Sequence, residues 1–213
     1  MDDQIDITSY KVWAALVGDS SASRKEWAAV VEGWSETHRR YHNLTHLAAV
    51  LNIVNGFTDA ATDPAAVALA AWYHDVVYDP LRDDNEQRSA ERADAGLRGL
   101  TIPSATVEEV VRLVLLTTSH DPAPEDANGM VLCDADLAVL AGSSEAYTAY
   151  ASAIRDEYKH YSDAEFTKGR IAVLEHLLSL PALYRLPSIA EDWTARAQAN
   201  MNAEVSQLRA RLT

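Results

Sequence analysis

Histidine and aspartate side chains recur at three places where helices are predicted to begin or end. The first is the segment His42–His46, the second is the dipeptide His74-Asp75, and the third is the segment Asp134–Asp136. Imidazole and carboxylate groups bind metal ions, and buried ionised groups must be paired or metal-bound. A lone His-Asp dipeptide has a simpler interpretation, a hydrogen-bonded core histidine beside a capping aspartate. The combination of the three segments is what favours a metal site.

His42 and His46 are four residues apart, so on one continuous helix both imidazoles would face the same side. Asn43, however, is a good N-cap for the helix that contains His46, and His42 would then precede that helix. The metalloprotease pattern His-Glu-x-x-His is absent, since no glutamate follows His42. The spacing alone therefore leaves open whether the two histidines share one site.

The two aspartates of the third segment, Asp134 and Asp136, diverge by about 200° on a helical wheel, so at most one should face a common site. The neighbouring apolar residues do not decide between them. His74 and Asp75 point about 100° apart on a helix. Both can therefore reach one ion only if that ion lies beside the helix end.

The His74-Asp75 pair follows a segment, Ala65–Tyr73, of nine residues without a polar break. Asp63 is a good N-cap for this helix, and Pro64 suits its first position because the missing N–H costs nothing there. A helix that is apolar on every side is normally buried in the middle of a domain. We therefore expect this helix to carry the pair into the centre of the protein.

Apolar residues repeat at helical spacing along the chain, and no segment alternates apolar and polar residues as a half-buried strand does. The sequence therefore predicts an all-α protein, a single-domain helical bundle over residues 1–213. The motif-bearing core is expected at about 39–178, with a C-terminal helix at 187–213 packed on it.

Three local features are also predicted. Thr106 and Glu109 have the spacing of a capping box at a helix N-terminus. Another helix is expected over Met130–Ala141. A tyrosine-rich stripe over Tyr147–Tyr161 has helical spacing and should line the core, a groove or the face of a possible homodimer.

The net charge of the 213-residue chain is −14. This charge opposes nucleic acid backbones and anionic membranes, so neither is an expected partner. Cys133 is the only cysteine, which excludes an intrachain disulfide and fits a reducing compartment. The acidic N-terminus lacks a signal-peptide pattern, and no apolar run approaches the roughly 20 residues that cross a bilayer. We therefore expect a soluble cytoplasmic protein.

The order of a histidine, a His-Asp pair and a distant aspartate resembles the HD superfamily of metal-dependent phosphohydrolases, which are all-helical proteins. In that family the first histidine opens one helix, the His-Asp pair ends another, and the last aspartate precedes leucine. The resemblance implies metal ligands at His46, His74, Asp75 and Asp136, in a bundle of the HD-domain, phosphodiesterase-like type. Asp134 would then be structural.

Further segments resemble a bacterial subgroup of predicted HD phosphohydrolases, from about Arg39 to the C-terminus. The shared segments are Arg39–His46, His74–Asp79, Asn85–Ala90, Asp134–Leu137, Ile154–Tyr158, Phe166 and Gly169-Arg170. Some nucleotide-cleaving HD enzymes place a glutamate three residues after the aspartate of the pair, where this chain has Tyr78. Asp79 and Glu86 are the nearest carboxylates in the sequence.

Two imidazoles and two carboxylates without a thiolate favour one divalent ion, which would be Mn, Fe, Co, Ni, Mg or Zn. The resemblance implies a phosphohydrolase that uses a metal-activated water on a phosphomonoester or phosphodiester of a small metabolite or nucleotide. Asp75 would take part in catalysis as well as metal binding. Asp79 or Glu86 would place the water or accept its proton.

A phosphorylated substrate of an acidic protein needs a local group of cations. We expect Arg39, Arg155 and Arg170 to supply them, since the arginine fork matches phosphate geometry. Arg40 and Lys159 have surface ion pairs as the simpler interpretation. The remaining histidines His38, His160 and His176 are expected to be structural.

His120 is predicted either to touch substrate at the pocket edge or to lie at a helix C-terminus, where a histidine is favourable. Two other functions remain open. One is a protein that binds a metal and a nucleotide without catalysis, which turnover measurements would separate from a hydrolase. The other is oxygen chemistry at a di-iron centre, for which only His42 and His120 could supply further ligands.

Overall fold

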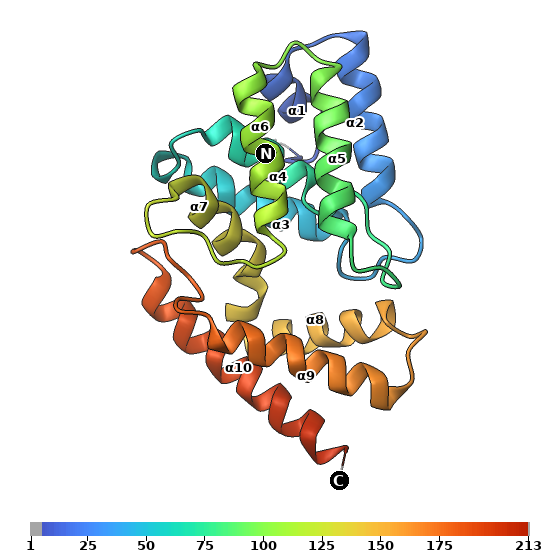
Figure 1. Cartoon of the computed structure of the whole chain (residues 1–213), viewed down its shortest axis with the longest axis vertical. Helices are drawn as coiled ribbons and strands as arrows, with labels where there is room; N and C mark the ends of the chain where they lie inside the picture. The colour runs from blue at the N-terminus through green and yellow to red at the C-terminus, as the bar shows by residue number, and fades with distance from the viewer. Residues whose placement is uncertain (1–5, 213) are drawn as a thin grey trace, which may run out of the picture.

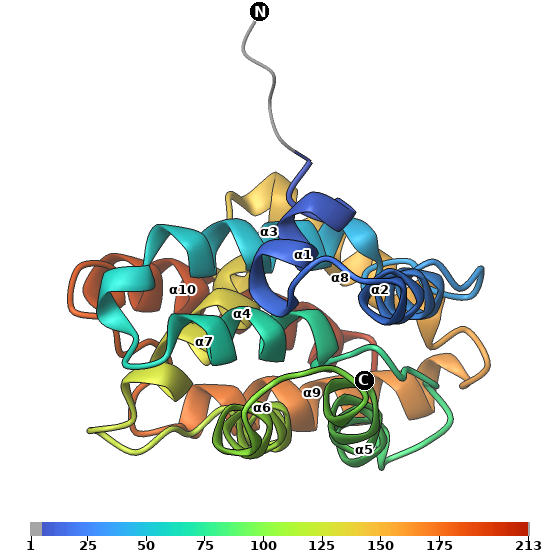
Figure 2. The same ribbon diagram turned by 90° about the horizontal axis from the view of Figure 1, so that it is seen from above.

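Helix α4, Pro64–Tyr73, lies at the centre of the larger group of helices (Figure 2). Its N-terminus forms as predicted, because the Asp63 side chain accepts a hydrogen bond from Ala66 N and Pro64 occupies the first turn. The helix packs against α3, α5, α6 and α7 and buries residues on all of its sides. His74 directly follows it and is likewise buried.

The computed structural model describes residues 6–212, which contain helices and no strand, so the all-α prediction is confirmed. Six helices surround α4 (Figure 1): α1 (Tyr10–Val17), α2 (Ser21–Trp34), α3 (Leu44–Gly56), α5 (Asn85–Arg98), α6 (Ser104–Leu116) and α7 (Ala127–Asp136). The remaining elements are two 3-10 helices and the C-terminal helices, namely η1 (Thr58–Ala60), η2 (Leu137–Ala141), α8 (Ser144–Glu157), α9 (Asp163–Ser179) and α10 (Ala190–Ala210).

Two hydrophobic cores hold the single domain together. The larger one joins α1 to α7, and its fully buried members include Trp13, Trp34 and Trp72. The smaller one joins η2, α8, α9 and α10 around Leu174 and Met201. In Figure 1 the helices of the smaller core form a separate layer beneath the others. The C-terminal helix α10 contacts α9 and η2.

The helix predicted over Met130–Ala141 is interrupted. The α-helical part, α7, ends at Asp136, and the chain continues as the 3-10 helix η2 from Leu137. The hydroxyl of Tyr184 donates to the carbonyl of Leu137 over 2.7 Å, which satisfies that carbonyl outside the α-helical ladder. The prediction of one continuous helix is therefore wrong, and the break falls directly after Asp136.

The predicted capping box of Thr106 and Glu109 is also wrong. Helix α6 begins earlier, at Ser104, directly after Pro103, which has φ −57°. No side chain forms a capping hydrogen bond at this N-terminus. Glu109 instead accepts hydrogen bonds from Arg112 and from Asn128, the latter in α7. The carboxylate therefore links two helices rather than closing the end of one.

Residues 1–5, which carry most of the acidic N-terminal segment, lie outside the described residues. Over residues 6–212, none of the helices combines the length and the apolar character that crossing a membrane requires.

Candidate metal centre

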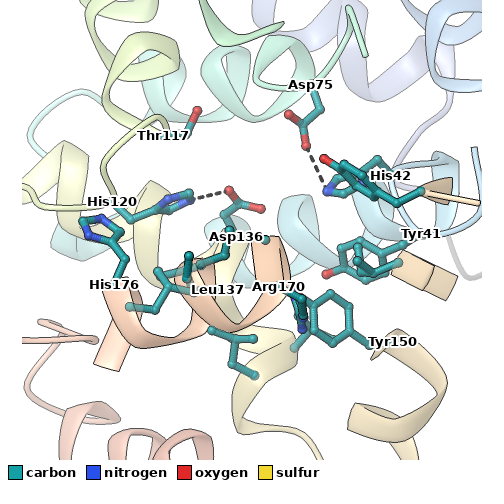
Figure 3. A pocket seen from close by; sticks show the side chains of 18 of the residues that line it. Tyr41, His42, Asp75, Thr117, His120, Asp136, Leu137, Tyr150, Arg170 and His176 are labelled. Atoms are coloured by element: carbon teal, nitrogen blue, oxygen red, sulfur yellow. Dashed lines mark hydrogen bonds and ion pairs between the residues drawn. The ribbon is translucent and has the colours of Figure 1, made fainter. Parts of the chain in front are cut away.

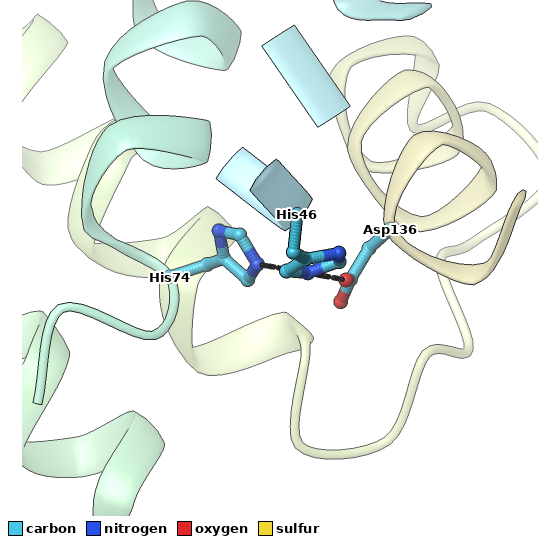
Figure 4. A group of neighbouring side chains, drawn as sticks. All are labelled: His46, His74 and Asp136. Atoms are coloured by element: carbon cyan, nitrogen blue, oxygen red, sulfur yellow. Dashed lines mark hydrogen bonds and ion pairs between the residues drawn. The ribbon is translucent and has the colours of Figure 1, made fainter. Parts of the chain in front are cut away.

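Three side chains from three helix ends converge where α3, α4 and α7 meet (Figure 4). His46 Nε2 lies 3.1 Å from Asp136 Oδ1 and 3.2 Å from His74 Nε2, and His74 Nε2 lies 3.5 Å from Asp136 Oδ1. Ligand atoms about 2.0–2.2 Å from an ion, at angles of about 90–110°, are roughly 2.8–3.6 Å from one another. The donor types and their spacing therefore fit a divalent ion, and this cluster could hold one.

The local structure of each helix end positions these three ligand atoms. Asn43 caps α3 by accepting from Thr45 N, so His46 falls in the first turn of that helix. His74 is the C-cap of α4, and Asp136 is the last residue of α7. Because helix ends can aim side chains along the axis as well as across it, three helices can point at one spot.

One hydrogen bond orients the His74 ring. Its Nδ1 lies 2.8 Å from the carbonyl oxygen of Ala71, an acceptor, so Nδ1 carries the proton and donates it. In the neutral imidazole Nε2 is then the unprotonated nitrogen, and it faces His46 and Asp136. A metal-ligating histidine commonly has its second nitrogen held by a carbonyl in this way.

The charges around the cluster reinforce one another. Burial lowers the pKa of His46. Burial alone would also lower the pKa of His74, but the charges of Asp75 and Asp136 outweigh it and raise the pKa to about 9. Burial would raise the pKa of Asp136, but the charge on His74 and hydrogen bonds from His120 and His46 hold it well below its usual range. Asp136 is thus an ionised, half-buried carboxylate that favours a cation beside it.

Asp75, also predicted as a ligand, lies at the side of this cluster. Its Oδ2 is 3.4 Å from His74 Nε2 and 4.0 Å from His42 Nε2, and Figure 3 shows it turned toward His42. It is not one of the three residues whose ligand atoms all lie within 4.8 Å of one another. The structure therefore brings together three of the four predicted ligands and places the fourth next to them.

The alternative between Asp134 and Asp136 is resolved by their surroundings. Asp134 is buried and accepts hydrogen bonds from the backbone N–H groups of Arg185 and Leu186, at 2.7–3.1 Å. Its carboxylate therefore fastens the segment before α10 to α7. The carboxylate of Asp136 instead faces His46 and His74.

Glu157 is a residue of the site to which sequence reasoning assigned no role. It is 2% exposed, and its Oε1 accepts the backbone N–H groups of Arg40, Tyr41 and His42 at 2.7–3.0 Å. Its Oε2 lies 2.7 Å from His42 Nδ1 and accepts the hydroxyl of Tyr78 over 2.9 Å. A single carboxylate from the end of α8 thus holds the whole segment before α3.

A cavity of about 630 Å³ opens beside the cluster, between the larger group of helices and α8–α9 (Figure 3). Its polar side carries His42, Asp75, His120 and Asp136, and Asp136 belongs to both the cluster and the cavity. Its opposite side is apolar and aromatic, with Tyr150, Ile154, Tyr158, Phe166, Val173 and Leu177 among its residues. The tyrosine-rich stripe therefore lines a groove along most of its length, whereas Tyr147 lies in the smaller core, so two of the three predicted possibilities apply.

His120 lies at the edge of this cavity. Its Nε2 is 2.8 Å from Asp136 Oδ2, the oxygen that does not face the two histidines. The backbone of His120 has φ 51°, in the left-handed region that non-glycine residues adopt at a cost of about 1 kcal/mol. His176, predicted to be structural, also lines this cavity.

The predicted phosphate-binding arginines have other partners. Arg39 has a fully buried side chain, and it donates to Glu36 and to the carbonyls of His42, Asp75 and Val76, outside the cavity. Its guanidinium therefore supports the backbone around His74 and is not placed to bind substrate.

Arg155 and Arg170 differ in position. Arg155 donates to the carbonyls of Tyr158 and Tyr161 and to Asp163, and it does not line the cavity. Arg170 does line it, but two of its nitrogens bind the carboxylate of Glu204. Of the secondary candidates, Arg40 forms the surface ion pair that was the simpler interpretation, with Asp156.

The two carboxylates that were expected to position the water or accept its proton, Asp79 and Glu86, lie in different cavities. Asp79 lines a different cavity of about 460 Å³, where its Oδ1 accepts the N–H of Leu81 in a tight turn. It is therefore not placed beside Asp136. Glu86, from the first turn of α5, lines the larger cavity and has no hydrogen-bond or ion-pair partner within residues 6–212.

Comparisons with known proteins add no relative. No protein-family model matches the chain, and no curated protein and no solved structure is significantly similar to it.

Proposed function

We propose that this chain is a metal-dependent phosphohydrolase of the HD type that acts on a phosphoester of a small molecule. The observation that carries the proposal is the spacing of 3.1–3.5 Å between the ligand atoms of His46, His74 and Asp136, at the edge of a cavity of about 630 Å³. The helix positions of these residues also agree with the HD pattern, since His46 opens α3 and His74 ends α4.

Four residues would bind the ion, and a fifth would accept a proton. His46, His74 and Asp136 would hold the ion, with Asp75 as the fourth ligand 3.4 Å from His74 Nε2. A divalent ion, when bound, lowers the pKa of a water and neutralises charge on a phosphoryl oxygen. Glu86 is the unpaired carboxylate of the cavity and can accept a proton there.

Two histidines of the cavity would have different roles, one toward the phosphoryl group and one toward Asp136. Glu157 holds His42 through Nδ1, so Nε2 is presented toward Asp75 and the cavity. His120 contacts the outer oxygen of Asp136 and fixes the rotation of that carboxylate. Burial would lower the pKa of His42, but Glu157 and Asp75 outweigh it and raise the pKa. In its protonated form His42 would donate from Nε2 to a phosphoryl oxygen, and His120 would keep Oδ1 of Asp136 aimed at the ion.

The first test is metal content after purification without chelator, for the natural chain and for His74→Ala, Asp136→Ala and His176→Ala. The matched control is His176→Ala, which removes a cavity histidine outside the cluster. We expect about one equivalent of a divalent metal, lost in the first two variants and kept in the control. Equal metal content in all four proteins would contradict the ligand assignment.

The second test is turnover of p-nitrophenyl phosphate and bis(p-nitrophenyl) phosphate by the metal-loaded chain. Metal-dependent release of p-nitrophenol, lost in Asp136→Ala, supports a hydrolase. Metal binding without turnover of any phosphoester would leave a protein that binds only. About two iron ions per chain, without phosphoester turnover, would favour the di-iron alternative.

A further inference from the structure

The cavity beside the cluster carries an unusual balance of charge for a phosphate-binding pocket. Four carboxylates line it: Asp75, Glu86, Asp136 and Glu165. Within residues 6–212, Arg170 is the only lysine or arginine that lines it. Its guanidinium is therefore the only permanent cation that could meet an anionic substrate there.

Arg170 is already neutralised by its neighbours. Its Nε and Nη2 donate to the two carboxylate oxygens of Glu204, at 2.9 and 3.1 Å, and its Nη1 donates to the Tyr150 hydroxyl over 3.1 Å. Its side chain is 6% exposed. Such a bidentate, buried pair leaves little of the positive charge for a ligand.

The side of the cavity formed by α9 carries an apolar stripe, with Glu165, Arg170 and His176 beside it. Phe166, Gly169, Val173 and Leu177 recur at helical spacing and all line the cavity, so one face of α9 forms this wall. A Cβ at Gly169 would meet nothing within 4 Å, so the cavity is open at that turn. Tyr150 and Ile154 of α8 continue the wall.

We infer that the pocket takes a monophosphate ester with an uncharged, apolar or aromatic organic part, and that it disfavours substrates with a second anionic group. The inference rests on the proposed function, since the ion and His42 would hold the one phosphoryl group. A second anion would meet Glu86 and Glu165 without a free cation. An apolar ring would instead be buried against the wall of α8 and α9.

Binding of three phosphonates, which cannot be hydrolysed, tests this without turnover. Methylphosphonate, phenylphosphonate and 4-carboxyphenylphosphonate are titrated by calorimetry into the full chain loaded with Mn²⁺. We expect phenylphosphonate to bind about tenfold or more tightly than methylphosphonate, because the ring buries apolar area. We expect the added carboxylate to weaken binding by about fivefold or more.

A pair of substitutions at Val173 isolates the charge effect. This side chain is 51% exposed at the cavity, so its replacement should not disturb the core. Val173→Lys and Val173→Gln both remove the apolar surface, and only the first adds a cation. We expect Val173→Lys to favour the carboxylated ligand over phenylphosphonate by about fivefold relative to Val173→Gln.

The outcomes separate the inference from the proposed function. Equal binding of the methyl and phenyl compounds, tighter binding of the carboxylated one, or no binding of any would overturn the inference. Preferred binding of phenylphosphonate without turnover of phenyl phosphate would support it as a ligand class and overturn the hydrolase. Faster turnover of glycerol phosphate than of phenyl phosphate would support a hydrolase and overturn the inference.

Discussion

The imidazole Nδ1 of His42 lies 2.7 Å from the Oε2 of Glu157, although 115 positions separate the two residues in the sequence. This contact joins the segment before α3, in the larger group of helices, to the end of α8 in the C-terminal layer. Because Glu157 also accepts three consecutive backbone N–H groups, it fixes the backbone of residues 40–42 and sets the direction of His42.

Replacing Glu157 by glutamine should destabilise the fold. The amide retains an oxygen for some of the N–H donors but introduces an NH₂ group among them, and it removes the charge that they complement. We expect a loss of about 2–4 kcal/mol in the free energy of unfolding, measured by urea denaturation. The neighbouring Asp156→Asn is the control, since Asp156 forms a surface pair with Arg40 and should contribute less than about 1 kcal/mol. Equal losses in the two variants would contradict the assigned role.

The same carboxylate should make stability depend on pH. Burial alone would raise the pKa of Glu157, but hydrogen bonds from His42 and from backbone N–H groups lower it from 4.5 to about 2. A lowered folded-state pKa gives stability that is present above about pH 4.5 and is lost as the pH falls toward 2. The difference in unfolding free energy between the natural chain and Glu157→Gln should therefore shrink across this range. A difference that stays constant from pH 5 to 2 would contradict the prediction.

Replacing Asp134 by alanine should lower stability and keep the metal, whereas replacing Asp136 by alanine should remove the metal. Asp134→Ala leaves the buried N–H groups of Arg185 and Leu186 without acceptors, so it should cost about 2–3 kcal/mol of stability. It should keep its metal. Asp136→Ala should lose its metal instead. Thermal unfolding of metal-free protein and metal content, measured on both variants, check the assignment, and the reversed pattern would show that it is wrong.

The positive φ of His120 predicts an unusual order of stability. Glycine accepts φ 51° freely and alanine does not, so His120→Gly should be more stable than His120→Ala by about 1 kcal/mol. At His176, within α9, the order should reverse by about 0.5 kcal/mol, because glycine disfavours helix. Both pairs lose the same imidazole, so each comparison isolates the backbone. The same order at both positions would contradict the strain.

Much of the site could be predicted from the sequence because its ligands lie at helix ends. Asn43 and Asp63 are strong N-caps, and the apolar helix α4 has only one plausible place, the core. The positions of His46 and His74 follow from these signals. The direction of the Asp136 side chain could not be predicted from these helix signals. It depends on the break after α7 and on the Tyr184 hydroxyl, which comes from a distant segment.

The partners of the arginines could not be predicted, for a different reason. Spacing shows that an arginine can reach a phosphate, but not that a nearer carbonyl or carboxylate already holds it, as happens at Arg39 and Arg170. Glu157 had a usable signal that received no interpretation. It follows Ile154 by three residues and Tyr150 by seven, on an apolar stripe, and a carboxylate at such a position must be buried with partners.

The break between α7 and η2 places Asp136 at a joint between two separately packed bodies. His46 and His74 belong to helices of the larger core, whereas Leu137, the next residue after Asp136, belongs to the smaller one. An ion shared by His46, His74 and Asp136 would bind α3, α4 and α7, which all belong to the larger core, so its binding free energy would stabilise that core and not the C-terminal layer. Unfolding would then depend on occupancy: the ion would raise the denaturant concentration at which the larger core unfolds and leave the opening of the C-terminal layer unchanged.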